Sequence, residues 1–426
     1  MKNKKMIKEI NCKNSNFKKK LKIFLEKRRS GKTINTSIVS KIIKDIKKDK
    51  LKALIKYEKK FSNNTKIKPS KKEINQSLKN LDPKIKKAID FAYSRIFKFH
   101  SMQRAKNIKY VDQYKNQIEY KHIPIQKVGV YVPANLPSTL LMNVIPAKLA
   151  GVKRVVVANP LVNGRLNAAV MYAAKICNVN EIITCGGAQA IGSLAYIQKV
   201  NKITGPGNDY VAKAKQLVFG DVGVEGMIAG PSEICILAEK KTEINEITTS
   251  ILGQSEHDEN SQSILITKYK DLITKVKKDI KHKLKQLPRK KIISKSLKNH
   301  GLLVLCQNDN QIIDLINEIA PEHLELNVSN AKKYINKIFN AGSICIGKYS
   351  PMAVTDYNAG SNHTLPTLGS AKFSSGLNLS EFYKKISYVN LSKKGVEKIG
   401  ESAIHLANYE GLTAHILSIK SRMRRK

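Results

Sequence analysis

The segment Lys127-Val128-Gly129-Val130-Tyr131-Val132 is rich in β-branched and aromatic residues and is followed by an apolar run with helical spacing at Leu140–Ala150. A second β-rich run follows at Lys153–Ala158. A strand, a helix and a second strand in this order form a unit in which the two strands lie parallel and the helix covers one face of the sheet. These residues therefore predict an α/β fold.

The same alternation continues along the chain and groups into two units. In the first unit we expect further strands at Glu181–Cys185, Lys202–Thr204 and Glu233–Ala238, and further helices at Asn167–Cys177, Ala188–Ile197 and Asp209–Phe219. In the second unit we expect strands at Ser263–Thr267, Leu302–Cys306, Leu324–Val328 and Ser343–Ile346, and helices at Ile244–Ser255, Asp271–Leu287, Gln311–Ile319 and Ala331–Phe339. The pattern predicts two Rossmann-like α/β domains, each with a parallel sheet covered on both faces.

The chain is expected to divide into four segments, at 1–120, 121–240, 241–378 and 379–426. The first segment carries apolar residues at helical spacing and no candidate catalytic residue, and we expect an N-terminal helical region that packs on the second α/β unit. The next two segments are the α/β domains. The last segment contains a helix-like stretch at Val396–Ile419, but it is too short to hold a large core alone. It is therefore expected to be a small helical tail that docks on another domain or another subunit.

The composition is that of a globular protein. With 426 residues, of which 42% are hydrophobic, the chain can build two substantial cores. The six cysteines show no C-x-x-C spacing and lie mostly in apolar runs, which predicts free buried thiols in a reducing cytoplasm. No apolar run has the length needed to cross a bilayer, so we expect no membrane partner.

The formal net charge of +44 is typical of proteins that bind nucleic acids or anionic membranes. However, lysines are spread through nearly every polar segment, aromatic residues make up only 6%, and there is no tryptophan. No RNP-like or helix-turn-helix pattern is present, so platforms for stacking bases are missing. We interpret the charge as a solvated surface without a nucleic-acid partner. A non-catalytic, basic nucleic-acid-binding protein remains an alternative, and steep salt-dependent binding without turnover would identify it.

Glycine-rich loops occur three times in or after the first unit, at Cys185–Gln189, Gly205–Asn208 and Ala229–Glu233. The first two lead from a strand into a helix, where free backbone N–H groups can receive a phosphate. None has the G-x-G-x-x-G spacing, so each can also be a tight turn. Their repetition within one α/β unit favours a nucleotide site at the carboxyl ends of its strands.

The stretch Ala320-Pro321-Glu322-His323-Leu324-Glu325-Leu326 places an acid and an imidazole side by side at a proline break. Histidine titrates near neutral pH, and a glutamate in a closed pocket can have its pKa raised far enough to act as a base. The pair can therefore share proton-transfer work. The alternative is a helix that ends at Pro321, with Glu322 and His323 exposed to solvent.

Residues that suit a metal ion occur in the second half of the chain. Gln254 and His257 lie three positions apart on one face of an expected helix, and Asp356 lies in a Gly/Asn/Ser-rich segment. In the tail, His415 follows Glu410. Imidazole and oxygen ligands without thiolates suit a catalytic zinc site. Spacing alone does not show that these side chains converge, and helix capping or surface roles are the alternative.

Taken together, these residues resemble the histidinol dehydrogenase family. The matching segments occur in family order and run from about Val128 to the end of the chain, whereas residues 1–120 match only in helical character. The segments are Gly129–Pro133, Leu141–Ala150, Gly186–Ala195, Gly205–Asn208, Ala229–Glu233, Gly253–Asp258, Ala320–Leu326, Asp356–Pro366, Phe373–Leu379 and Glu410–His415. An ordered series of motifs is far more specific than any one of them.

The resemblance implies an NAD-dependent enzyme with one zinc ion per subunit that oxidises L-histidinol through the aldehyde to L-histidine, the last step of histidine biosynthesis. It implies that Glu322 activates water for the second oxidation and that His323 removes the protons. The implied zinc ligands are Gln254, His257, Asp356 and His415. The implied substrate contacts are Ser232, Gln254, His257, His323, Asp356, Glu410 and His415. The implied NAD contacts are Tyr131, Gln189 and Asn208, which makes 121–240 the NAD-binding side and 241–378 the catalytic side.

The resemblance also implies an intertwined homodimer in which the C-terminal tail completes the site of the neighbouring subunit. This would explain why a tail without a core of its own carries His415. A paralogous zinc- and NAD-dependent dehydrogenase that acts on another polar alcohol is the nearest alternative, because similar machinery can serve a different pocket.

Overall fold

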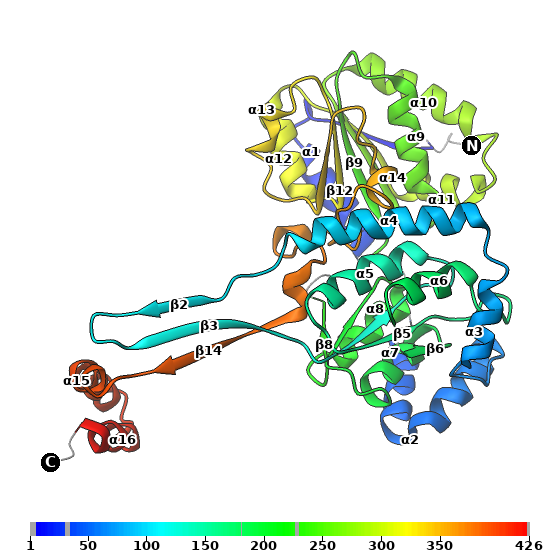
Figure 1. Cartoon of the computed structure of the whole chain (residues 1–426). Coiled ribbons are helices and arrows are strands. Elements are labelled where there is room, and N and C mark those ends of the chain that lie inside the picture. Colours follow the sequence, from blue (N-terminus) through cyan, green and yellow to red (C-terminus); the bar gives the residue numbers. More distant parts are fainter. Residues whose placement is uncertain (1–5, 30–34, 180, 226–229, 424–426) are drawn as a thin grey trace.

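The computed structural model describes residues 6–29, 35–179, 181–225 and 230–423. Two parallel sheets form two lobes of the body, and a long antiparallel ribbon projects from it (Figure 1). The predicted α/β class with two parallel sheets is confirmed. None of the helices within the described ranges is long and apolar enough to span a bilayer.

The first sheet has the strand order β6-β5-β4-β7-β8, and all neighbours are parallel. Its strands are β4 (Lys127–Tyr131), β5 (Arg154–Ala158), β6 (Glu181–Ile183), β7 (Lys202–Thr204) and β8 (Gly223–Val224). Helices α4 (Pro83–Ser101), α5 (Pro137–Leu149) and α6 (Ala168–Ile176) share a core with one face. Helices α2 (Thr36–Ser62), α7 (Gly187–Tyr196) and α8 (Asp209–Val218) cover the other. Burial on both faces explains the unbroken valine runs of the central strands.

The second sheet has the order β1-β11-β10-β9-β12-β13 and is also parallel. Its strands are β1 (Lys8–Asn11), β9 (Glu233–Ala238), β10 (Gln262–Thr267), β11 (Gly301–Leu305), β12 (His323–Asn327) and β13 (Ser343–Ile346). Helices α1 (Phe17–Arg29), α12 (Asp309–Ile319) and α13 (Lys332–Ile335) lie on one face. Helices α9 (Ile244–Ser255), α10 (Lys270–Leu284) and α11 (Lys290–His300) lie on the other.

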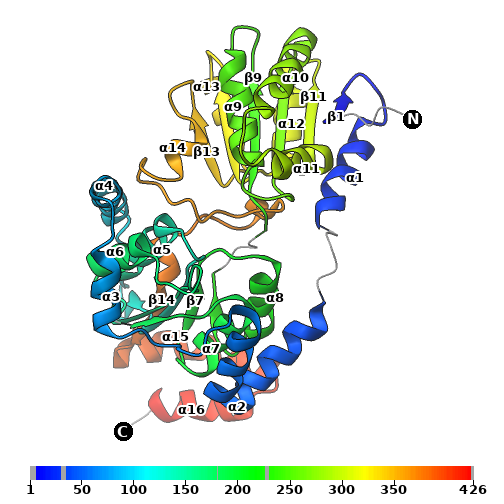
Figure 2. The same cartoon turned by 90° about the vertical axis from the view of Figure 1, so that its right-hand side faces the viewer.

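The N-terminal segment differs from the expected single helical region on the second domain. Strand β1 extends the second sheet beside β11, and α1 lies against that domain (Figure 2). Helices α2, α3 (Lys71–Leu78) and α4 instead pack on helices of the first domain. Ile46 of α2 lies so close to Gly192 of α7 that an added Cβ there would be 3.1 Å from its terminal methyl group. The segment 1–120 therefore supports both domains.

The domain boundaries also differ from those expected. Strand β9 was placed in the first domain, 121–240, but it pairs with β10 and β12 in the second sheet. A strand that is buried on both faces is apolar throughout, so its sequence does not show which of the two sheets it joins. Strand β8 still belongs to the first sheet, and β9 is the next strand in the chain. Ala229, in the expected loop there, lies outside the described residues. Leu377, Leu379 and Phe382, expected near the end of 241–378 and the start of the tail, return to the core of the first domain.

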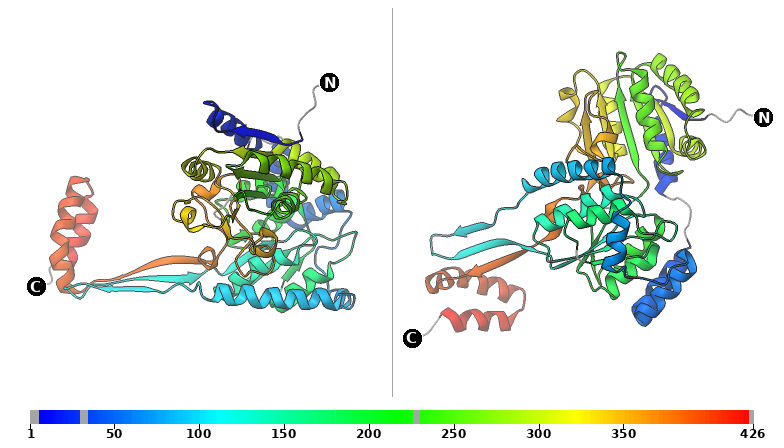
Figure 3. Two further views of the ribbon diagram at one scale, coloured as in Figure 1. Left: turned by 90° about the horizontal axis from the view of Figure 1, so that it is seen from above. Right: turned by 45° about the vertical axis from the view of Figure 1, so that its right-hand side comes forward.

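The antiparallel ribbon was not anticipated from the sequence. It consists of β2 (Ile108–Val111), β3 (Gln117–Pro124) and β14 (Tyr383–Asn390), in the order β14-β3-β2. At its tip, far from both sheets, it carries α15 (Lys393–Tyr409) and α16 (Thr413–Met423) (Figure 3). The expected helix Val396–Ile419 is interrupted where Gly411 adopts a φ of 73°. The remaining short helices are α14 (Met352–Thr355), η1 (Ser370–Lys372) and η2 (Leu379–Phe382).

The loop after β7 depends on Gly205, which has a φ of 110° and whose Cβ position is occupied by the Tyr131 carbonyl oxygen. Gly220 is a matched control, because it has a φ of 104° with no heavy atom within 4 Å of an added Cβ. Gly220→Ala should lower the free energy of unfolding by about 1–3 kcal/mol through backbone strain. Gly205→Ala should lower the free energy of unfolding by at least ~1 kcal/mol more than Gly220→Ala, because its Cβ would collide with the Tyr131 carbonyl oxygen. Urea unfolding followed by circular dichroism measures both, and equal losses would contradict the close approach.

Candidate active site

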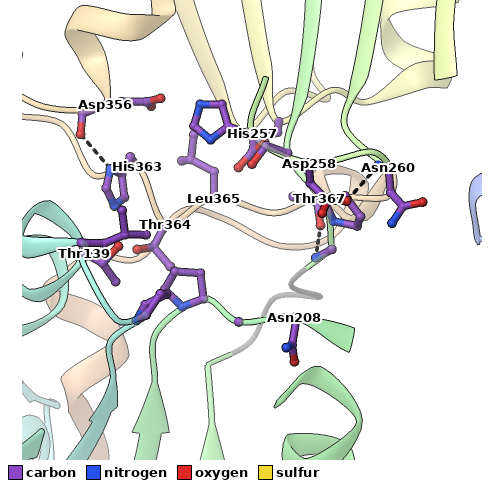
Figure 4. Close-up of a pocket in the computed structure, with 18 of the residues that line it drawn as sticks. Thr139, Asn208, His257, Asp258, Asn260, Asp356, His363, Thr364, Leu365 and Thr367 are labelled. Carbon is purple, nitrogen blue, oxygen red and sulfur yellow. Dashed lines mark hydrogen bonds between the residues drawn. The ribbon is translucent and has the colours of Figure 1, made fainter. Parts of the chain in front are cut away.

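A cavity of about 370 Å³ lies between the two lobes and is lined by both (Figure 4). The first domain contributes Pro133, which follows β4, and Pro206 and Asn208, which follow β7. The second domain contributes Ser232, directly before β9, and Glu322, directly before β12. The carboxyl edge of the first sheet therefore faces the amino edge of the second. The volume is within the range of small-molecule sites.

The position of the cavity on the first sheet follows the rule for doubly wound sheets. Strand β4 continues through α5 to β5 on one side, while β7 lies on its other side, so β4 and β7 flank a point where the strand order reverses. Ligands bind outside the carboxyl ends of the strands at such a point. The rule does not cover the second sheet, whose contribution comes from the opposite ends of its strands.

Glu322 and His323 are both buried at this edge, not exposed at a helix end. His323 Nδ1 lies 3.7 Å from Glu322 Oε2, and His323 Nε2 lies 3.2 Å from Asp356 Oδ1. Burial lowers the pKa of His323, but the carboxylates of Glu322 and Asp356 outweigh this and raise the pKa well above the ordinary value. Burial also raises the pKa of the Glu322 carboxyl group. The arrangement can accept and hold protons.

Gln254, in the last turn of α9, has no hydrogen-bond partner within the described structure for either atom of its buried amide group. Asp356 Oδ1 and His323 Nε2 likewise make no hydrogen bond there, although they lie close together. His257 follows α9, and its side chain lines the same cavity (Figure 4). Buried polar atoms are normally satisfied, so these atoms are available to contact a bound ion, water molecule or substrate.

Among the described residues, no three His, Cys, Asp or Glu side chains converge as metal ligands. The expected zinc set contains only two such residues near the cavity, His257 and Asp356, because its third member there is Gln254. The fourth, His415, is exposed on α16 at the tip of the ribbon, and Glu410 is exposed beside it. One chain therefore brings together Gln254, His257 and Asp356 but not the tail residues.

Glu325 supports this cluster and was missed by sequence reasoning. Its buried carboxylate accepts hydrogen bonds from the Met352 N–H at 2.7 Å and from Ser250 Oγ at 3.2 Å. It thereby ties β12 to α9, which carries Gln254, and to α14, which leads to Asp356. The signal in the sequence is an acid between two leucines of a predicted strand, where a buried carboxylate must find partners.

His363 holds the Asp356 segment from the other side. Its Nδ1 donates a hydrogen bond to the Asp356 carbonyl oxygen at 2.7 Å (Figure 4). Burial lowers the pKa of His363, which favours the neutral ring. The imidazole therefore lines the cavity and holds the Asp356 backbone in place.

The three residues expected to contact NAD lie in different environments. Asn208 lines the cavity, and its Oδ1 accepts a hydrogen bond from Val211 N at 3.2 Å at the start of α8. Tyr131 and Gln189 are buried beside the start of α7 and do not line the cavity. The Tyr131 hydroxyl accepts a hydrogen bond from the Gly187 N–H at 3.3 Å.

The loop at Gly186 differs from the expected free phosphate cradle. The Gly186 N–H and Gln189 Nε2 each donate a hydrogen bond to Glu58 Oε1, both at 2.8 Å. Glu58 comes from α2, in the segment where no functional residue was expected, and burial raises the pKa of its carboxyl group. A carboxylate of the chain itself thus accepts the N–H of Gly186, directly before α7. Of the two loops that lead from a strand into a helix, Gly205–Asn208 is the one that lines the cavity.

The histidinol dehydrogenase family model matches residues 25–423. The chain belongs to the histidinol dehydrogenase family. It is 55% identical to a histidinol dehydrogenase of Pelagibacter ubique, over 99% of this chain and 100% of that one. Identity to the histidinol dehydrogenase of Sulfurimonas denitrificans is 41%, over 96% of this chain and 98% of that one. Membership in this family of oxidoreductases also implies a nucleotide cofactor.

The fold agrees with a solved member of the same family. The crystal structure of histidinol dehydrogenase from Elizabethkingia anophelis aligns with a TM-score of 0.92 and 34% sequence identity, covering 98% of each chain. The predicted family and enzyme class are thereby confirmed.

Proposed function

We propose that this chain oxidises L-histidinol through L-histidinal to L-histidine. Each histidinol consumes two NAD molecules, and each subunit holds one zinc ion. The observation that carries the proposal is the buried Glu322–His323 pair beside the unsatisfied amide of Gln254 and the carboxylate of Asp356. This cluster offers two proton acceptors and ligands for a cation in one small cavity. The family match supports the choice of substrate.

The residues of the cavity fit a catalytic zinc ion. We assign Gln254, His257 and Asp356 as ligands from one subunit and the partner subunit's His415 as the fourth. When bound, zinc acts as a Lewis acid and can hold the amino and imidazole nitrogens of the substrate. The absence of cysteine ligands suits a catalytic rather than a structural site.

The first oxidation requires one proton acceptor. His323 would take the hydroxyl proton of the carbinol as the C–O bond becomes the carbonyl of the aldehyde, and NAD, when bound, would supply the hydride acceptor for the carbinol carbon. His323 Nε2 suits this role because it is buried and has no hydrogen-bond partner among the described residues. The neighbouring carboxylates stabilise the imidazolium that forms.

The second oxidation requires a water molecule and a second base. Glu322 would take a proton from water as the water oxygen bonds to the aldehyde carbon. His323, after releasing its first proton, would take the hydroxyl proton of the resulting hydrate, and a second NAD would supply the hydride acceptor. Overall, histidinol, water and two NAD⁺ give the histidine carboxylate, two NADH and three protons. The raised pKa of Glu322 makes its ionised form a stronger base.

We further propose that the remaining contacts are shared between two subunits. Ser232 lines the cavity beside Gln254 and His257 and is assigned to the substrate. Glu410 and His415 of the partner subunit complete the set. Tyr131 and Gln189 shape the NAD side behind Asn208, because they fix the start of α7.

A homodimer accounts for the ribbon and its helices. The ribbon leaves apolar side chains exposed on one face in the single chain, among them Ile118 and its register partners Tyr110 and Val389, and α15 exposes Leu406 and Tyr409. Contiguous apolar surface of this kind normally lies in an interface. A second copy would bury it and receive the tail.

The cysteines support a cytoplasmic location. All six are buried and free of disulfides, as expected in a reducing compartment.

The proposed reaction predicts two NADH for each histidinol consumed by purified protein. Chelation should abolish turnover, and added Zn²⁺ should restore it, because zinc positions the substrate. The measurement is NADH absorbance against histidinol loss. A protein that binds zinc and NAD but does not turn over histidinol would instead act on another polar alcohol.

The two bases predict different kinetic defects. Glu322→Gln should slow oxidation of histidinal by about 100-fold or more, and oxidation of histidinol to the aldehyde much less, because only the second step needs activated water. His323→Ala should slow both steps while zinc content stays unchanged. Single-turnover kinetics with each substrate separate the steps. Equal losses in Glu322→Gln, or loss of zinc in His323→Ala, would contradict the assigned roles.

The shared site predicts complementation between subunits. His415→Ala should lower zinc content, because it removes a ligand from the partner's cavity. In a mixed dimer with a Glu322→Gln subunit, one cavity keeps its own Glu322 and receives an intact His415, so activity should return to about half of wild type. Separately tagged, co-expressed subunits provide the mixed dimer. A mixed dimer as inactive as its parents would argue against the exchange of tails.

A further inference from the structure

Arg28, near the end of α1, reaches from the N-terminal segment to the loop in front of β9. It is buried, and its guanidinium group uses all three nitrogens. Nη1 donates to Glu233 Oε1 and Nη2 to the Pro231 carbonyl oxygen, while Nη2 also lies 3.3 Å from the Ser232 carbonyl oxygen. Nε donates to the Asn260 carbonyl oxygen at 3.1 Å. A planar guanidinium group can bind several carbonyl oxygens of one loop at once, which fixes the loop.

Glu233 connects Arg28 to the two proposed bases, Glu322 and His323. Its backbone N–H donates to Glu322 Oε2 at 2.7 Å, and the Glu322 N–H donates to Glu233 Oε2 at 3.3 Å. Its carbonyl oxygen lies 3.3 Å from His323 Nδ1. Leu368 N also donates to its carboxylate, at 2.7 Å. Glu233 and Glu322 thus hold each other reciprocally across the adjacent strands β9 and β12.

The charges in this corner require compensation. Glu233 and Glu322 are both buried and are connected by hydrogen bonds between backbone and side chain. Two negative charges that are close together and shielded from water repel each other strongly. The side chains of Arg28 and Glu233 are each only 3% exposed, so their attraction is weakly screened. Arg28 therefore holds the Glu233 carboxylate in its present orientation.

We propose that Arg28 is a positioning residue of the active site, which fixes the Ser232 loop and, through Glu233, the orientation of the Glu322 carboxylate. The inference rests on the proposed function, because it takes Glu322 as the base of the second oxidation. It also gives the N-terminal segment, where nothing catalytic was expected, a direct role in shaping the cavity.

Arg154 provides a matched control. It makes a similar fork, with Nη2 at 2.7 Å from Glu181 Oε2 and Nη1 at 2.6 Å from the Gln198 carbonyl oxygen. It lies at the first residue of β5, at the end of the first sheet opposite the cavity. Arg154→Gln therefore removes an Arg–Glu ion pair, more exposed than that of Arg28, without touching the proposed site.

The test compares Arg28→Gln, Arg28→Lys and Arg154→Gln with wild-type protein. Arg28→Gln should lower kcat for histidinal oxidation by roughly 10- to 100-fold and lower histidinol oxidation much less, with zinc content and the KM for NAD unchanged. Arg28→Lys should recover part of the loss, because it keeps the charge but not the fork. Arg154→Gln should leave the ratio of the two rates unchanged whatever its effect on the melting temperature.

Two results would overturn the inference. One is an Arg28→Gln enzyme with wild-type rates, and the other is an equal loss in both oxidations, as expected from a stability defect alone. If Arg28→Gln does not fold, Arg28→Lys provides the test. A lowered ratio of histidinal to histidinol oxidation supports the inference, and an unchanged ratio overturns it. Wild-type protein that fails to oxidise histidinol would refute the proposed function itself, whereas an active wild type with an unchanged ratio in the variants refutes only the role of Arg28.

Discussion

The burial of charge at the amino edge of the second sheet is the constraint on which the rest of the site depends. Glu233, Glu322 and Asp356 place three carboxylates in one corner, and such groups are stable there only when paired. Arg28 and His323 provide the pairing, and they come from opposite ends of the chain. The fold must therefore bring α1, β9, β12 and the segment after α14 to one place. The same corner is where the proposed chemistry needs proton acceptors.

The two lobes contribute to the cavity in different ways. The first sheet offers loops after its strands, where backbone turns such as Gly205–Asn208 approach a ligand closely. The second sheet offers side chains from the starts of its strands, where Glu322 and His323 are held rigidly by the ladder between β9 and β12. A cofactor on the loop side and a metal on the strand side would place the reacting carbon between them. Rigid elements hold the bases, and loops receive the mobile cofactor.

Much of the fold could be predicted from local pattern. The predicted bounds of β9, α9 and β13 agree with the structure residue for residue, because apolar runs and helical spacing report burial directly. Strand β1 was missed because its four residues, Lys8–Asn11, include two charges and resemble a surface turn. The ribbon was missed although Gln117–Lys121 alternates polar and apolar residues, because β3 pairs with β14, which lies far away in the chain. The sheet that β9 joins depends on long-range pairing, which local pattern does not contain.

The site could be predicted only in part, for a similar reason. Glu322, His323, Gln254 and Asp356 lie in recognisable motifs, and the structure brings them together. Buried residues that support the cavity without lining it gave no such signal. Glu58 and Glu325 are single acids within a helix and a strand, whose importance becomes visible only when their buried partners are known.

The central claim is that one cavity is completed by two chains. A crystal structure of the zinc-loaded protein with L-histidinol, with the metal located by anomalous scattering at the zinc edge, tests it most directly. The account predicts zinc bound to Gln254, His257 and Asp356 of one subunit and to His415 of the other, with the substrate between the metal and His323. Zinc bound outside this cavity, or by ligands from a single chain, would contradict it.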